Sequence, residues 1–409
     1  MVKIQKYFFI LFYIYIVTHD MVFFPKISYV DDMIFFVAFL TIILSALTPS
    51  GRTKFYQLWD KADRQIMIFL ALYLIVGLLS TTISQQQQNI IAILTDIEYQ
   101  IKFFIIFLGG LLWSKDLKNG LLRDIIPIAK ILLVLITLGG FLSIFMNIGL
   151  SDMSQIRYGL NPYVFLYSSY TYLVLAVVYM MVPILAVNQK HKLYWEIGAT
   201  FVLLSTLRSK AFMFVICYFL FQYIWKNRNK ISRGVLNTGM LIAGSISIAA
   251  VYNMLTYYFE DPNLPRSSFY STGIRIAQEY FPFGSGFGSF ANATSYKYGS
   301  LVYQNFGIQA LYDNLQWYAW GFDIFWPNIY GQFGVIGLLI YLYMLILIIK
   351  SLLSKLNHSN ERKIFMGLML ITYLIIASLA EAVFFNFSAC SGALILSVYI
   401  MGNSDDKNI

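Results

Sequence analysis

Residues 327–349 read PNIYGQFGVIGLLIYLYMLILII and contain no charged side chain. About 20 consecutive apolar residues are enough for one helix to cross the hydrocarbon core of a membrane. Similar runs recur along the 409-residue chain, in which 59% of the residues are hydrophobic and only 12% are charged. A soluble fold of this size cannot bury so much apolar surface. The sequence therefore predicts an all-α, polytopic integral membrane protein and excludes a disordered or nucleic-acid-binding protein.

The apolar runs predict about twelve transmembrane helices, which form a single transmembrane domain over residues 1–409. The first run lacks a cleavage site made of small residues, so we expect it to be retained. The span at 193–207 is short for a membrane crossing. The predicted spans are 5–24, 30–48, 65–84, 97–113, 125–149, 165–187, 193–207, 210–225, 235–258, 327–349, 364–380 and 386–402.

Lysine and arginine residues predict the orientation of these spans, because they are enriched in cytoplasmic loops. With the N-terminus in the cytoplasm, the cytoplasmic side receives 21 of the 29 basic residues. The acidic residues lean the other way, with 12 of 20 outside. We therefore expect an even number of spans with both termini in the cytoplasm. The net charge of +9 is explained by this asymmetry and requires no anionic partner.

One connection is long, and it lies on the outer face at residues 259–325. It holds 18 Phe, Tyr and Trp residues in 67 positions. Such rings either lie in the lipid interface or stack on the apolar faces of a sugar, for which Trp317 and Trp320 are candidates. Residues 271–281 predict a short amphipathic helix, stopped by Pro282. Its predicted apolar face holds Ile274, Ala277 and Phe281.

A glycine-rich stretch follows this helix, at Gly284-Ser285-Gly286-Phe287-Gly288. Alternating glycines can form a backbone nest that binds phosphate, which makes Gly284 and Gly286 candidate substrate-binding residues. The alternative is a flexible turn. A dinucleotide site is excluded because no strand precedes the glycines.

The outer face has few cations, so each of them is informative. Arg157, Arg208 and Arg275 come from three separate loops and are predicted to converge on one cavity. Arginine suits phosphate because its planar guanidinium donates two hydrogen bonds at once. The alternatives are that Arg275 pairs with Glu279 four residues later, and that Arg208 extends to lipid headgroups. Two further candidates for substrate binding on this face are Arg266 and Lys210.

Two carboxylates on the same face are candidates for proton transfer or substrate binding. Asp323 lies among aromatic residues, where a raised pKa would let it act as a base, although it could equally cap the next helix. Glu381 lies between the last two spans. Neither cysteine has a Cys or His partner at metal-ligand spacing, and the three histidines are far apart. We therefore predict no metal and no cofactor.

Several of these motifs resemble those of the Wzy-type O-antigen and capsular polysaccharide polymerases and of the related O-antigen ligases, chiefly over residues 200–345. Thr206-Leu207-Arg208-Ser209 resembles the family's Ser-Arg turn between two spans. Arg275 and Gly286 match its spacing of an arginine, ten residues and a glycine. Residues 282–288 resemble its glycine-rich segment, and Gly334-Val335-Ile336-Gly337 resembles its glycine pair.

The resemblance implies a GT-C-like fold in the plasma (inner) membrane of a bacterium. It also implies a metal-independent glycosyltransferase that joins oligosaccharide repeats carried on undecaprenyl pyrophosphate. In that case Arg208 and Arg275, supported by Arg157, would stabilise the departing pyrophosphate, and Asp323 would be the base. A chain-length regulator is an expected partner.

Other functions stay open alongside the polymerase. Relatives that act as ligases carry a His-Asn pair where this chain has Asp323-Ile324, so the ligase is the second expectation. A transporter or flippase of lipid-linked oligosaccharide is the third, but the chain shows no repeat between its halves, which many transporters have.

Overall fold

The computed structural model describes residues 2–24, 27, 29–114, 121–146, 148–187, 191–227, 265–309, 324–355 and 361–401. These residues form an all-α protein with 15 α-helices and no sheet. The helices are α1 (Val2–Thr18), α2 (Val30–Leu47), α3 (Pro49–Leu58), α4 (Lys61–Ser84), α5 (Ile90–Ser114), α6 (Leu121–Phe145), α7 (Tyr170–Ala186), α8 (Lys192–Ser205), α9 (Ser209–Asn227), α11 (Pro265–Glu279), α12 (Ala293–Lys297), α13 (Leu301–Asn305), α15 (Trp326–Ser354), α16 (Glu361–Ser378) and α17 (Phe387–Leu394), which continues as a π-helical segment, Ile395–Ile400.

Four of the described helices, α2, α4, α6 and α15, are long and apolar enough to cross a membrane. The chain is therefore a multi-pass membrane protein. Eleven of the twelve predicted spans coincide with a described helix. The twelfth, at 235–258, lies outside the described residues.

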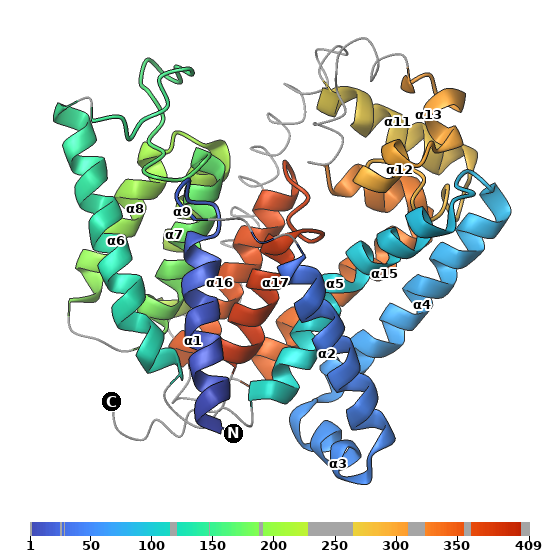
Figure 1. The fold of residues 1–409 in the computed structure, drawn as a ribbon, viewed down its shortest axis with the longest axis horizontal. Coiled ribbons are helices and arrows are strands. Elements are labelled where there is room, and N and C mark those ends of the chain that lie inside the picture. The colour runs from blue at the N-terminus through green and yellow to red at the C-terminus, as the bar shows by residue number, and fades with distance from the viewer. Residues whose placement is uncertain are drawn as a thin grey trace.

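Helices α6 to α9 lie along one flank of the bundle, and α4, α5 and α15 lie along the other (Figure 1). Helices α1, α16 and α17 lie between the two flanks. The short helices α11 to α13 gather over one end of α4, α5 and α15, where α11 packs on α15. The start of α1 and helix α3 lie at the opposite end.

Helix α1 ends at Thr18, six residues before the end of the predicted span. Met21 instead forms an isolated antiparallel bridge with Tyr167. The Tyr167 hydroxyl donates to the carbonyl oxygen of Val17 at 2.6 Å. These contacts hold the loop before α7 against the end of α1, and α7 begins at Tyr170, five residues later than predicted.

Helix α3 was not predicted, because it is too short and too polar to give a hydropathy signal. Pro49 occupies its first turn, and the side chain of Thr48 accepts a hydrogen bond from the Gly51 N–H at 3.2 Å. Both features favour a helix start. Its Arg52 and Lys54 belong to the basic residues that the sequence-based topology predicts on the cytoplasmic side.

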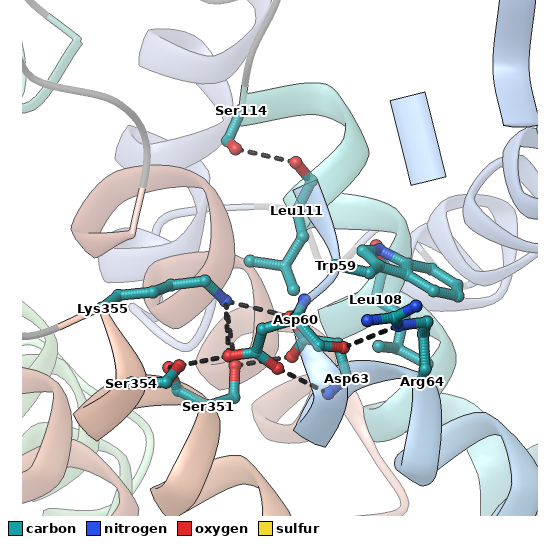
Figure 2. A network of polar contacts seen from close by, with 10 residues as sticks. All are labelled: Trp59, Asp60, Asp63, Arg64, Leu108, Leu111, Ser114, Ser351, Ser354 and Lys355. Carbon is teal, nitrogen blue, oxygen red and sulfur yellow. Dashed lines mark hydrogen bonds and ion pairs between the residues drawn. The ribbon is translucent and has the colours of Figure 1, made fainter. Parts of the chain in front are cut away.

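A polar clasp joins the first turn of α4 to the end of α15 (Figure 2). Asp60 and Asp63 cap each other's backbone N–H groups, at 2.9 and 3.1 Å. Fully buried Asp63 also accepts hydrogen bonds from Ser351 Oγ at 2.5 Å and from Lys355 Nζ at 3.0 Å. Ser354 donates to Asp60. The clasp therefore satisfies a buried carboxylate with groups from the other helix.

Replacing Lys355 with methionine is expected to destabilise the protein by about 1–3 kcal/mol, because Asp63 would stay buried without its cation. The measurement is thermal unfolding of the purified protein in detergent. Lys350→Met is the matched control, since Lys350 lies on the same helix over the Tyr343 ring. An unfolding temperature for Lys355→Met equal to that of the control would contradict the role of the clasp.

Candidate functional site

Basic side chains from three separate segments gather at the end of the bundle near the turn between α8 and α9. We call Arg157, Arg208, Lys210 and Arg266 the cationic cluster. Arg208 Nη2 donates to Thr171 Oγ1 at 2.8 Å, and Lys210 Nζ donates to the Thr171 carbonyl oxygen at 3.5 Å. The charges of Arg157 and Arg266 both act on Arg208. Residues far apart in sequence are thereby brought to one place.

The ring of Tyr170, the first residue of α7, lies under two of these guanidinium groups. The guanidinium carbon of Arg208 is 4.2 Å from the ring centroid, and that of Arg157 is 5.2 Å from it. Arg157 Nη2 also donates to the Tyr170 hydroxyl and to Gln155 Oε1, both at 3.3 Å. The guanidinium groups therefore make cation–π contacts and hydrogen bonds to neutral acceptors, and neither kind of contact supplies a negative charge.

No carboxylate lies within ion-pair distance of Arg157 or Arg208 in the described part of the chain. Glu381 is taken by Lys210, with Nζ 2.5 Å from Oε1. Burial lowers the pKa of the Arg208 guanidinium from its ordinary value, and the charges of Arg157 and Arg266 lower it further, against the opposite effect of Tyr170 and Glu381. A bound anion would relieve this repulsion, so the arrangement suits an anionic ligand.

Local sequence explains how the cluster is held. The Ser169 hydroxyl accepts a hydrogen bond from the Thr171 N–H and caps α7, which fixes Tyr170 at the helix start. Leu207 has a φ of +54° and turns the chain sharply between α8 and α9, so that Arg208 follows at the end of the bundle. The backbone of Arg157 pairs with that of Leu160 at 2.8 and 2.9 Å.

A mostly apolar pocket of about 510 Å³ opens beside the cationic cluster. Its lining includes Leu160, the backbone partner of Arg157, and Leu207, the chain neighbour of Arg208. The pocket therefore lies close to two of the arginines, although none of the four cations lines it. The lining residues are Ser143, Ile144, Phe145, Met146, Ile148, Leu150, Ser151, Met153, Leu160, Asn161, Tyr163, Ser205 and Leu207.

The glycine segment, residues 282–289, is neither a phosphate nest nor a flexible turn. It lies buried between α4 and α15, and its backbone N–H groups from Gly284 to Ser289 all donate hydrogen bonds within the protein. Gly284 and Gly286 therefore keep no free N–H for a phosphate. The acceptors, at 2.7–3.1 Å, are Tyr280 O, Gly331 O, Gln332 O, Thr81 Oγ1, Asp96 Oδ2 and Gln332 Oε1.

Close backbone packing explains why this segment needs glycine. Gly286 has a φ of +87°, and a Cβ there would lie 2.4 Å from the Cα of Thr81 on α4. Gly334 has a φ of +60° inside α15, and a Cβ there would lie 2.2 Å from the carbonyl oxygen of Pro282. The glycines matched to the family motifs thus serve the packing of the outer loop against the membrane helices.

Arg275 does not make a described contact with the cationic cluster. It is exposed on α11, with its guanidinium carbon 5.4 Å from the Phe306 ring centroid. The predicted apolar face of this helix is wrong, because Ile274 and Phe281 are 45% and 70% exposed. The buried face instead includes Ile276, and helix α11 packs against α15.

Three of the predicted site residues, Asp323, Trp317 and Trp320, lie outside the described residues. Sequence reasoning missed Tyr170, Thr171 and Gln155. A signal was present for Tyr170, an aromatic residue directly after a Ser-Ser pair at a loop-to-span boundary. That position is also typical of an ordinary interfacial tyrosine.

A second charged cluster lies elsewhere, between α2 and α5. Lys102 is 1% exposed and lies 2.5–3.4 Å from carboxylate oxygens of Asp31, Asp32 and Glu98. Although Lys102 belongs to the few cations expected outside, its charge is already fully matched. This cluster therefore joins two helices and is not a candidate anion site.

No protein-family model matches the chain, and no curated protein matches it. Across the described residues, no group of three or more His, Cys, Asp or Glu side chains is arranged to hold a metal ion. The features that bear on function are therefore the cationic cluster, the neighbouring pocket and the motif resemblance.

Proposed function

We propose that the protein is a glycosyltransferase that polymerises undecaprenyl-pyrophosphate-linked oligosaccharide repeats into surface polysaccharide, either O-antigen or capsule. The observation that carries this proposal is the convergence of Arg157 with Arg208 and Lys210, which come from two separate segments. Two of these cations have no described carboxylate partner. Such a site matches the chemistry of a diphosphate leaving group.

In the proposed reaction, a hydroxyl of an incoming repeat attacks the anomeric carbon of the growing chain. A new glycosidic bond forms, and the bond from the anomeric carbon to the pyrophosphate oxygen breaks. The electron pair leaves with undecaprenyl pyrophosphate, and the hydroxyl proton passes to a base. Because negative charge grows on the leaving group, Arg157 and Arg208 would stabilise the transition state more than the ground state.

Two carboxylates remain candidates for the base. Asp323 is the candidate from sequence, and its place is outside the described residues. Glu381 belongs to the cationic cluster through Lys210. The activated donor already carries its leaving group, so the proposal needs no nucleotide or other cofactor.

The pocket supports a lipid-borne substrate. The pocket has a volume of about 510 Å³ and a mostly apolar lining. These properties suit part of a hydrocarbon chain. The neighbouring arginines suit the anionic head of the same molecule. An amphiphilic anion at the membrane surface combines both properties, whereas a free nucleotide sugar has no hydrocarbon chain to place there.

We further propose twelve spans in the bacterial inner membrane, with both termini in the cytoplasm and the cationic cluster at the outer face. The start of α1 and the basic helix α3 lie at one end of the bundle, and α11 to α13 lie at the other (Figure 1). This separation agrees with the charge asymmetry. A chain-length regulator protein is the proposed partner, together with the lipid-linked substrate.

The test is the length of surface polysaccharide on a gel, in a strain deleted for the gene and complemented with wild type. We expect single repeats in the deletion strain and a restored ladder after complementation. A ladder in the deletion strain itself would overturn the polymerase proposal. Long chains that accumulate without transfer to their lipid acceptor would indicate a ligase, and repeats trapped in the cytoplasm would indicate a transporter.

A further inference from the structure

We propose that Tyr170 is a positioning residue, whose ring holds Arg157 and Arg208 at the spacing that binds a diphosphate in preference to a monophosphate. This inference depends on the proposed function for the identity of the ligand. It concerns a residue that carries no motif of the family that the sequence resembles.

Arg157 and Arg208 repel each other, and no described carboxylate lies within ion-pair distance of either. Both guanidinium carbons nevertheless lie within 5.2 Å of the centroid of one tyrosine ring. The negative face of an aromatic ring attracts cations without neutralising them. The Tyr170 ring therefore holds two positive charges together and leaves both charges available to a ligand.

The ring and the hydroxyl of Tyr170 make different contacts with the two arginines. The Tyr170 hydroxyl donates to Gln155 Oε1 at 2.6 Å and accepts from Arg157 Nη2 at 3.3 Å. It makes no described hydrogen bond with Arg208, which instead donates to Thr171 Oγ1. The hydroxyl thus orients only one of the arginines, whereas the ring contacts both. Phenylalanine would keep the shared contact, and leucine would remove it.

The Tyr170 side chain is barely accessible to a ligand. Tyr170 is 6% exposed, and its hydroxyl is already bonded to Gln155. A ligand held by the guanidinium groups would therefore not need to touch Tyr170. Its contribution would be exerted through Arg157 and Arg208, by fixing how far apart their donors lie. Two linked phosphates should depend on that separation more than one phosphate does.

The experiment measures binding of farnesyl diphosphate and farnesyl monophosphate to the purified full-length protein in detergent. The variants are Tyr170→Phe and Tyr170→Leu. Tyr56→Leu is the matched control, because Tyr56 also lies under an arginine, Arg64, but at the other end of the bundle. Melting curves confirm that each variant is folded, and farnesol reports binding through the hydrocarbon chain alone.

We expect Tyr170→Leu to weaken farnesyl diphosphate binding by about 10-fold or more, and monophosphate binding much less, so that the preference for diphosphate falls. Tyr170→Phe should stay within about 3-fold of wild type for both probes. Tyr56→Leu should bind both probes as wild type does.

Unchanged selectivity in Tyr170→Leu would overturn the inference, whether binding is retained or both probes weaken equally. An effect of Tyr170→Phe as large as that of Tyr170→Leu would also overturn it, since the hydroxyl would then be responsible. If the wild-type protein fails to bind farnesyl diphosphate, the diphosphate site of the proposed function fails as well. Binding by wild type with no effect of the leucine variant removes only the role of Tyr170.

Discussion

In the proposed reaction, Arg208→Ala is expected to lower the rate of chain extension by about 10²-fold or more, because it would remove a preorganised cation from the developing charge of the proposed leaving group. Arg208 is partly buried, and its described hydrogen bonds go to the neutral Thr171 side chain. Its charge is therefore not neutralised by a described neighbouring carboxylate. The assay is single-turnover extension of lipid-linked repeats, extracted from the deletion strain, by purified protein.

The comparison variants separate this effect from a loss of folding or of general charge. Arg64→Ala removes an arginine that lies over Tyr56 at the other end of the bundle, and should leave the rate unchanged. Arg208→Lys keeps the charge but loses the planar pair of donors, so we expect an intermediate rate. Arg275→Ala tests whether the exposed arginine of α11 contributes at all. A folded Arg208→Ala protein with the wild-type rate would refute the assigned site.

Gly286→Ala is expected to give a large loss of stability, on the order of 2–5 kcal/mol, from backbone strain and overpacking together. Its φ is +87°, and the added Cβ would meet the backbone of Thr81 at 2.4 Å. The two nearest atoms, the Cα and N of Thr81, belong to the backbone, so no side-chain rotation can relieve the clash. The measurement is the yield of monodisperse protein in detergent and its unfolding temperature.

Gly299→Ala provides the control for backbone strain alone. Gly299 also has a positive φ, +68°, but a Cβ there would meet nothing within 4 Å. We expect it to cost only about 1–2 kcal/mol. Equal losses from the two variants would show that the close packing of the glycine segment contributes nothing to stability.

Much of the candidate site was predictable, because its signal was electrostatic. The predicted topology leaves few cations outside, so the sequence drew attention to Arg157, Arg208, Lys210 and Arg266. The structure brings these four into one cluster. Arg275 was predicted on the same ground and on motif spacing, yet its described contact is with Phe306. Spacing along the chain does not say which way a residue on a surface helix faces.

The role of the glycine segment was not predictable from local sequence. Positive φ values and absent side chains serve equally well to expose backbone N–H groups to a phosphate or to admit another helix. Only the distant partners distinguish the two, and Thr81 lies about 200 residues away in the sequence. Likewise, hydropathy located α15 but not its interruption at Gly334, which depends on the approach of Pro282.

The insertion of the glycine segment has a consequence for synthesis of the chain. Ser84 donates to the carbonyl oxygen of Ser285 at 2.6 Å, and Asp96 accepts from the Gly288 N–H at 2.8 Å. These partners follow late in the chain, since Ser285 and Gly288 lie 201 and 192 residues after Ser84 and Asp96. During synthesis the facing ends of α4 and α5 therefore form before the segment that fills the space between them. The packing of these two helix ends is completed only once the glycine segment has been made, and a chain truncated before it would lack that packing.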